Sequence, residues 1–145
     1  TGEVFGSERC DCRPQLDEAI RLCSAEGGVI LWLDQEGRGT GLTSKIKAYE
    51  LQERTGLDTY AADAALGHPA DLRTYDVAAQ MLRLLGITRI RLLTGSPRKL
   101  AALQACGIDA VAQASGTFTT AHNIDYLRAK KAAGHDLALD DEDVE

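Results

Sequence analysis

Residues 89–112 read RIRLLTGSPRKLAALQACGIDAVA, and this stretch decides the fold class. Residues 89–93 and 108–112 are predicted to be strands. Between them, Ser96 and Pro97 are start signals for a helix over 97–105, which Gly107 ends. A strand, a helix and a second strand in this order indicate an α/β layer structure with at least partly parallel strands.

The rest of the chain continues this alternation. The continuous apolar run VILWL at 29–33 predicts another buried strand. Apolar periodicity, with glycines as terminators, predicts helices over 14–26, 42–54, 61–66, 74–85 and 123–133. We therefore expect a single α/β domain with a mixed, largely parallel sheet flanked by helices.

The charge pattern separates a neutral body from an acidic end. The net charge is −6, but the last ten residues hold six acids and no base, so 16 acids remain against 16 Lys and Arg. A neutral body without a basic stripe argues against nucleic acid as a partner. Residues 1–10 have neither the basic start nor the apolar core of a signal peptide, and no apolar stretch reaches about 18 residues, so we expect no membrane partner and a cytoplasmic location. Residues 138–145 are predicted to be a disordered acidic tail.

Four cysteines in such a chain are expected to be thiols or metal ligands. Cys23 and Cys106 follow helical apolar patterns and are predicted to be core residues. Cys10 and Cys12 are separated by one residue, so both thiolates can reach one soft metal, and zinc fits best. The pair can equally be coincidental, and two sulfurs leave a catalytic zinc site one protein ligand short.

Two glycine-containing loops follow predicted strands and open predicted helices, at 35–41 and 94–99. Backbone N–H groups at such helix starts favour an anion, and ligands bind at the carboxyl ends of strands in open α/β sheets. In the first loop, the carboxylate of Glu36 suits a purine edge and the guanidinium of Arg38 a phosphate. A flexible turn is the simpler explanation for this loop. By themselves, Asp71 and Arg73 would be a surface pair that contributes little.

Six motifs in register resemble the GTP cyclohydrolase II family. They are C-D-C-x-x-Q-L at 10–16, Q-E-G-R-G-x-G-L at 35–42, K-I-K-A-Y-x-L-Q at 45–52, L-D-T-x-x-A at 57–62, L-G-x-P-A-D-L-R-x-Y at 66–75 and R-L-L-T-x-x-P-R-K at 91–99. Y-L-x-x-K-x-x-x-G-H at 126–135 extends the match, so residues 1–137 are expected to be the catalytic core.

The resemblance implies an activity, cofactors and a set of site residues. Family members hydrolyse GTP to formate, pyrophosphate and 2,5-diamino-6-(5-phospho-ribosylamino)pyrimidin-4(3H)-one, the first step toward riboflavin. One Zn²⁺ per subunit, Mg²⁺ and a homodimer are implied. By position, Arg73 matches the proposed nucleophile at the α-phosphorus, Asp71 the proton acceptor and Tyr49 a catalytic tyrosine. The matched GTP contacts are Gln15, Glu36, Gly37, Arg38, Thr59, Thr94 and Lys99. Cys10 and Cys12 match two zinc ligands; the third would precede Thr1, so the N-terminal part of the family fold is expected to be missing.

Three segments depart from the family pattern. Gly95-Ser96 and Thr43-Ser44 replace usual asparagine-containing pairs, and residues 114–121 lack an arginine-valine-proline stretch. These departures leave open a variant enzyme of secondary metabolism with a different pyrimidine product. A non-catalytic nucleotide-binding domain and a hydrolase that releases only pyrophosphate are further alternatives. The parent chain can also be bifunctional.

Overall fold

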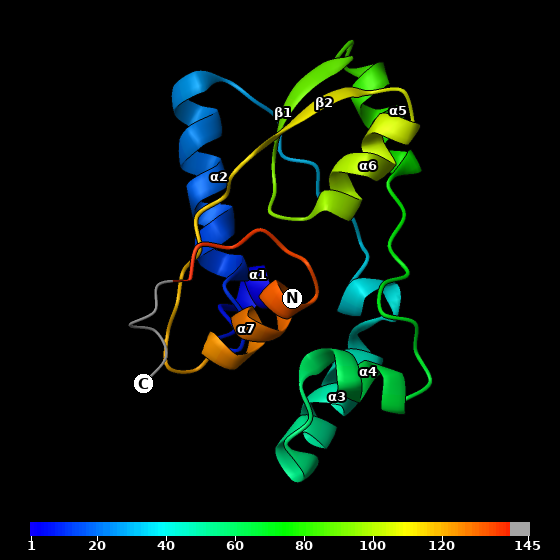
Figure 1. Cartoon of the computed structure of the whole chain (residues 1–145). Coiled ribbons are helices and arrows are strands. Elements are labelled where there is room, and N and C mark those ends of the chain that lie inside the picture. The colour runs from blue at the N-terminus through cyan, green and yellow to red at the C-terminus, as the bar shows by residue number, and fades with distance from the viewer. Residues whose placement is uncertain (140–145) are drawn as a thin grey trace.

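A computed structural model describes residues 1–139 as a mixed α/β structure (Figure 1). In chain order the elements are α1 (Gly2–Phe5), α2 (Cys12–Glu26), the 3₁₀ helix η1 (Gly37–Gly39), α3 (Leu42–Thr55), α4 (Thr59–Ala65), α5 (Asp76–Leu84), β1 (Arg89–Leu93), α6 (Pro97–Ala105), β2 (Asp109–Gln113) and α7 (Ile124–Ala132). The predicted α/β class is confirmed. Of the acidic tail, residues 140–145 lie outside the described part.

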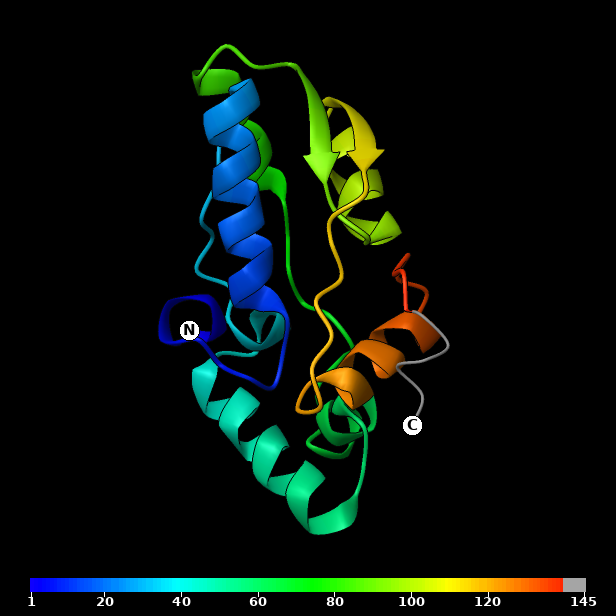
Figure 2. The ribbon, with the colours of Figure 1, turned by 90° about the vertical axis from the view of Figure 1, so that its left-hand side faces the viewer.

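The two strands form a parallel pair in the register Arg89 to Asp109 through Leu93 to Gln113. Their carboxyl ends point toward the half of the molecule that holds α3, α4 and α7 (Figure 2). Helices α5 and α6 pack on this sheet, and their buried side chains, including Ala79, Leu82 and Leu103, form the hydrophobic core. The loop that joins β1 to α6 therefore lies on the side of the sheet that faces α3, α4 and α7.

The strand predicted at 29–33 is wrong. This segment has no regular secondary structure and pairs with no strand among residues 1–139. Leu31 and Leu33 pack against the core, whereas Val29, Ile30 and Trp32 are exposed. An apolar run indicates which side chains favour burial, but a strand also needs a neighbour that accepts its backbone hydrogen bonds.

The predicted core cysteines are only partly buried. Cys106 packs against the core cluster, whereas Cys23 is half-buried at the cavity described below. No helix in the described part of the chain is long and apolar enough to cross a membrane.

Candidate active site

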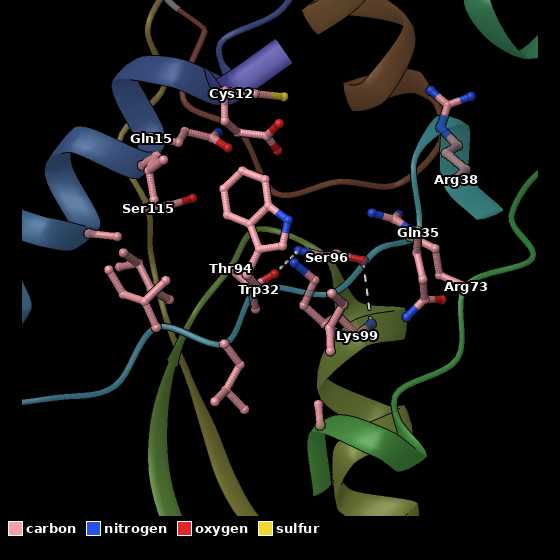
Figure 3. Close-up of a pocket in the computed structure, with 18 of the residues that line it drawn as sticks. Cys12, Gln15, Trp32, Gln35, Arg38, Arg73, Thr94, Ser96, Lys99 and Ser115 are labelled. Carbon is pink, nitrogen blue, oxygen red and sulfur yellow. Dashed lines mark hydrogen bonds between the residues drawn. The ribbon is translucent and has the colours of Figure 1, made fainter. Parts of the chain in front are cut away.

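A cavity of about 1390 Å³ lies between strand β1 and helices α2, α3 and α7. Figure 3 shows Cys12 and Gln15 on α2 across from Thr94, Ser96 and Lys99, with Trp32 between them. Most residues assigned from the sequence line this cavity: Cys10, Cys12, Gln15, Glu36, Gly37, Arg38, Tyr49, Thr59, Arg73, Thr94 and Lys99. Asp71 instead lines a smaller second pocket, which Arg73 shares. Segments far apart in sequence thus converge on one site.

The cysteine pair lies at the start of α2. The side chains of Cys10 and Cys12 contact each other, and the hydrogen bond from Cys12 lowers the pKa of Cys10 to about 6. The same hydrogen bond, together with burial, raises the pKa of Cys12. Asp11 between them is fully buried and accepts hydrogen bonds from Gln15 (2.7 Å) and Lys130 (3.4 Å). The buried carboxylate therefore ties the cysteine turn to α7.

Two adjacent thiols, one of them favoured as a thiolate, suit a soft metal such as zinc. No group of three or more His, Cys, Asp or Glu side chains that could hold a metal ion occurs within residues 1–139. The donor chemistry of the pair therefore fits two zinc ligands, and a third ligand is required from elsewhere.

The glycine-rich loop carries Glu36 and Arg38. Glu36 accepts hydrogen bonds from Lys45 (2.8 Å) and from its neighbour's N–H (3.0 Å). Burial alone would raise the pKa of Glu36, but these hydrogen bonds and that of Thr1 outweigh it and lower the pKa. Gly39 has φ +91° and a Cβ there would lie 3.0 Å from Leu72 Cβ, so glycine lets this loop pack against the segment holding Arg73.

Asp71 and Arg73 form a bidentate ion pair. Arg73 Nε and Nη2 donate to the two carboxylate oxygens at 3.0 and 2.9 Å, and the Arg73 backbone N–H adds a third bond of 3.0 Å. The hydrogen bonds that Arg73 donates to the Asp71 carboxylate raise the pKa of Arg73. Burial raises the pKa of Asp71, but the bonds from Arg73 outweigh it, so the pKa is lowered. The side chains of Arg73 and Asp71 are only 27% and 14% exposed, so the pair is more than an exposed surface contact.

The loop after β1 supplies a hydroxyl cluster and a cation. Thr94 Oγ1 accepts from the Ser96 N–H at 3.0 Å, and Ser96 Oγ caps α6 by accepting from the Lys99 N–H at 3.4 Å (Figure 3). Burial lowers the pKa of Lys99, and the nearby cations Arg73 and Lys130 lower it further. This end of the cavity is electropositive and suits an anion.

Tyr49 on α3 lies beside two cations, with its ring centroid 4.7 Å from the Arg9 guanidinium and 5.9 Å from the Lys45 ammonium. Burial raises the pKa of its hydroxyl. Thr59 is the first residue of α4.

Sequence reasoning missed several lining residues. Trp32, Lys45, Tyr60, Asp63, Lys130 and His135 also line the cavity. Lys130 and His135 belong to the motif at 126–135, for which the family resemblance implied no residue roles. The Y-x-x-D spacing of Tyr60 and Asp63 is the only local signal for that pair, since both then lie on one face of a helix.

Comparison with known proteins shows the family. Residues 1–115 match the family model described as GTP cyclohydrolase II. GTP cyclohydrolase-2 of Psychromonas ingrahamii is 53% identical over 138 residues, which are 93% of this chain and 68% of the relative. The corresponding protein of Vibrio cholerae is 49% identical over 144 residues, with 96% and 71% covered. Riboflavin biosynthesis protein RibBA of Bacillus subtilis is 50% identical over 132 residues, 90% of this chain but 33% of that protein. The chain thus spans about two thirds of the first two relatives and one third of the last.

Proposed function

Because the chain belongs to the GTP cyclohydrolase II family, hydrolases of riboflavin biosynthesis that act on GTP, we propose that it opens the guanine imidazole ring with release of formate and pyrophosphate. The pyrimidine product is then 2,5-diamino-6-(5-phospho-ribosylamino)pyrimidin-4(3H)-one. The observation that supports this best is that the cavity carries different chemical groups on its two sides. Cys12 of the thiol pair lies on one side of the cavity, and Lys99 lies across from it with Arg73, which is held by Asp71 from the adjoining pocket.

The two sides suit the two reactions. Guanine placed toward α2 brings its C8 near the cysteine turn, and the α-phosphate then reaches Arg73. In the charged Asp71–Arg73 pair, the N–H donors of the guanidinium that Asp71 leaves unoccupied can bind phosphate and stabilise the charge that develops as pyrophosphate leaves. Lys99 adds a second cation on the same side.

We propose that one zinc ion is held by Cys10 and Cys12 with a third ligand from outside the described residues. When bound, zinc supplies Lewis-acid activation of water at neutral pH. Mg²⁺ is proposed to accompany the triphosphate and offset its charge. Cys12→Ser is expected to lower the zinc content measured by atomic absorption and to stop formate release while some pyrophosphate release persists. A Cys12→Ser variant with full zinc and full formate release would remove the cysteine pair from the site.

Product analysis tests the function. The purified protein is incubated with GTP and Mg²⁺, and formate and pyrophosphate are measured separately. Ring opening yields both products, whereas pyrophosphate alone identifies partial hydrolysis and neither product identifies a nucleotide-binding domain. Arg73→Ala should abolish both products, with Asp71→Asn nearly as inactive. Near-normal pyrophosphate release by Arg73→Ala would contradict the role of Arg73. Identification of the pyrimidine separates the riboflavin reaction from a variant of secondary metabolism.

We further propose a homodimer and a cytoplasmic location. The dimer is inferred from the family resemblance, and the location from the expected substrate, a nucleotide of the cytoplasm. The four cysteines are free thiols, which agrees with a reducing compartment.

A further inference from the structure

A second pocket of about 350 Å³ adjoins the main cavity. Its walls come from η1, α4, the start of α6 and the residues after α7, and they carry Arg38, Arg73, Arg98 and His135. Arg98 and His135 have no role in the proposed reaction. Arg73, Arg38 and His135 line both spaces, so the two pockets meet at these side chains.

Arg38 is fixed in this wall by two residues of α4. Its Nη1 donates to Asp63 Oδ2 at 2.8 Å, and both side chains are largely buried, with 14% and 11% exposed. The guanidinium also lies over the Tyr60 ring, 4.0 Å from its centroid. Asp63 is the only hydrogen-bond partner of the guanidinium within residues 1–139, which leaves its remaining N–H donors for a ligand.

The backbone of Arg38 is held as firmly as its side chain. Its φ of 55° lies in the left-handed region, which non-glycine residues seldom adopt. Its carbonyl accepts a hydrogen bond of 2.9 Å from the Leu72 N–H, next to Arg73. Strain of this kind persists only where the surroundings impose it, and it gathers at functional sites.

The opposite wall is also cationic. Arg98 Nη2 donates to the Asp71 carbonyl at 2.8 Å, and Nη1 lies 3.4 Å from the Asp71 carboxylate. Beside it, burial lowers the pKa of His135 and the positive charges around it, with Lys130 first, lower it further, so His135 adds a neutral imidazole and the charge comes from the arginines. Asp63 and Asp71 offset only part of this charge, so the pocket favours an anion.

We propose that this second pocket holds the two terminal phosphates of GTP, and that Tyr60 and Asp63 position Arg38 to bind them. The inference rests on the proposed function, which puts the α-phosphate at Arg73. A triphosphate that passes Arg73 enters the second pocket, where Arg38, Arg98 and His135 surround its β- and γ-phosphates. Asp63 acts through Arg38 and does not itself contact the substrate.

Calorimetric binding of inorganic pyrophosphate, at constant Mg²⁺, tests the pocket apart from turnover. Asp63→Ala should weaken pyrophosphate binding by roughly ten-fold, because the guanidinium loses its charged hydrogen-bond partner. Asp63→Asn keeps an acceptor oxygen and should bind within about three-fold of the native protein or more tightly. GMP, which lacks the terminal phosphates, should bind all three proteins alike. Asp17→Ala, which removes an exposed carboxylate on α2, is the matched control.

Turnover gives a readout that general damage to the fold would not produce. Asp63→Ala should raise KM for GTP while kcat is largely kept, and Asp63→Asn should restore KM. Arg98→Met should weaken pyrophosphate binding from the opposite wall, and Arg54→Met, on the exposed face of α3, should not.

The proposal is overturned if Asp63→Ala and Arg98→Met both bind pyrophosphate as the native protein does. It is equally overturned if GMP binding falls as much as pyrophosphate binding, or if Asp63→Asn is as impaired as Asp63→Ala. Failure of the proposed function looks different: the native protein would release no formate, whatever the pyrophosphate affinities of the variants.

Discussion

At the scale of single residues, the proposed role of Arg73 depends on the planar shape of its guanidinium as well as on its charge. It holds Asp71 through two parallel hydrogen bonds, a geometry that a lysine ammonium cannot reproduce although it keeps the charge. We expect Arg73→Lys to lose activity by about 100-fold or more, close to Arg73→Ala, because misplaced phosphate contacts are costly. Rates of pyrophosphate and formate release measure this. If Arg73→Lys kept a tenth of the native rate, charge alone would be sufficient and the fork unnecessary.

His135 gives the protein a pH-dependent stability. Its pKa is lowered in the folded state by burial and by the nearby cations. Between this value and the ordinary value of about 6.5, the unfolded chain binds more protons, so the free energy of unfolding falls as the pH falls below about 6.5. Denaturant unfolding from about pH 7.5 to about 5.5 should therefore show a smaller loss in His135→Gln than in the native protein. His122→Gln, which changes an exposed histidine, should keep the native slope. Equal slopes in native protein and His135→Gln would contradict this origin.

The sequence predicted individual site residues where a motif gave them a role. Glu36, Arg73 and Lys99 were identified in this way, and the structure brings them to one cavity. Asp63 was missed because its importance comes from Arg38, which lies 25 residues away in sequence. Contacts between residues so far apart in sequence are made by tertiary packing, and the spacing of residues along the chain does not predict them.

At the scale of elements, α4 depends on its first residues. Asp58 caps this seven-residue helix by accepting from the Tyr60 and Ala61 N–H groups, both at 2.8 Å. Asp58→Ala should lower the free energy of unfolding by about 1 kcal/mol. It should also raise KM for GTP, because α4 carries Thr59 and the residues that hold Arg38. Asp58→Ser keeps a capping oxygen and should preserve both values. Denaturation and steady-state kinetics measure the two effects, and an unchanged KM would separate α4 from substrate binding.

Element prediction succeeded where the signals were local. The helix at 97–105 was predicted with its observed bounds, because Ser96, Pro97 and Gly107 mark its ends within the same stretch of chain. Helix α2 begins two residues before the predicted Pro14, since its N-terminal turn includes Cys12. The segment at 29–33 failed because its conformation depends on a pairing partner, which no local pattern specifies.

At the scale of the whole molecule, the proposed homodimer makes a testable prediction. Large apolar side chains stand exposed on several elements, among them Phe5, Trp32, Leu84 and Leu85. Single exposed apolar residues are ordinary, but Leu84 and Leu85 are adjacent at the end of α5 and are 88% and 58% exposed. If the proposed dimer forms, this exposed pair is a candidate for its contact surface. Closed two-fold dimers are the commonest symmetric oligomers.

We therefore expect sedimentation equilibrium at micromolar concentration to give twice the monomer mass. An interface built on apolar surface should persist when the salt concentration is raised, because screening weakens ion pairs but leaves apolar burial intact. Apart from its last ten residues the chain has no net charge, so we do not expect long-range electrostatic attraction to drive association. Measurements at low and high salt in parallel separate the two cases. A dimer that dissociates at high salt would show that ion pairs hold it, and a monomer at every concentration would contradict the dimer itself.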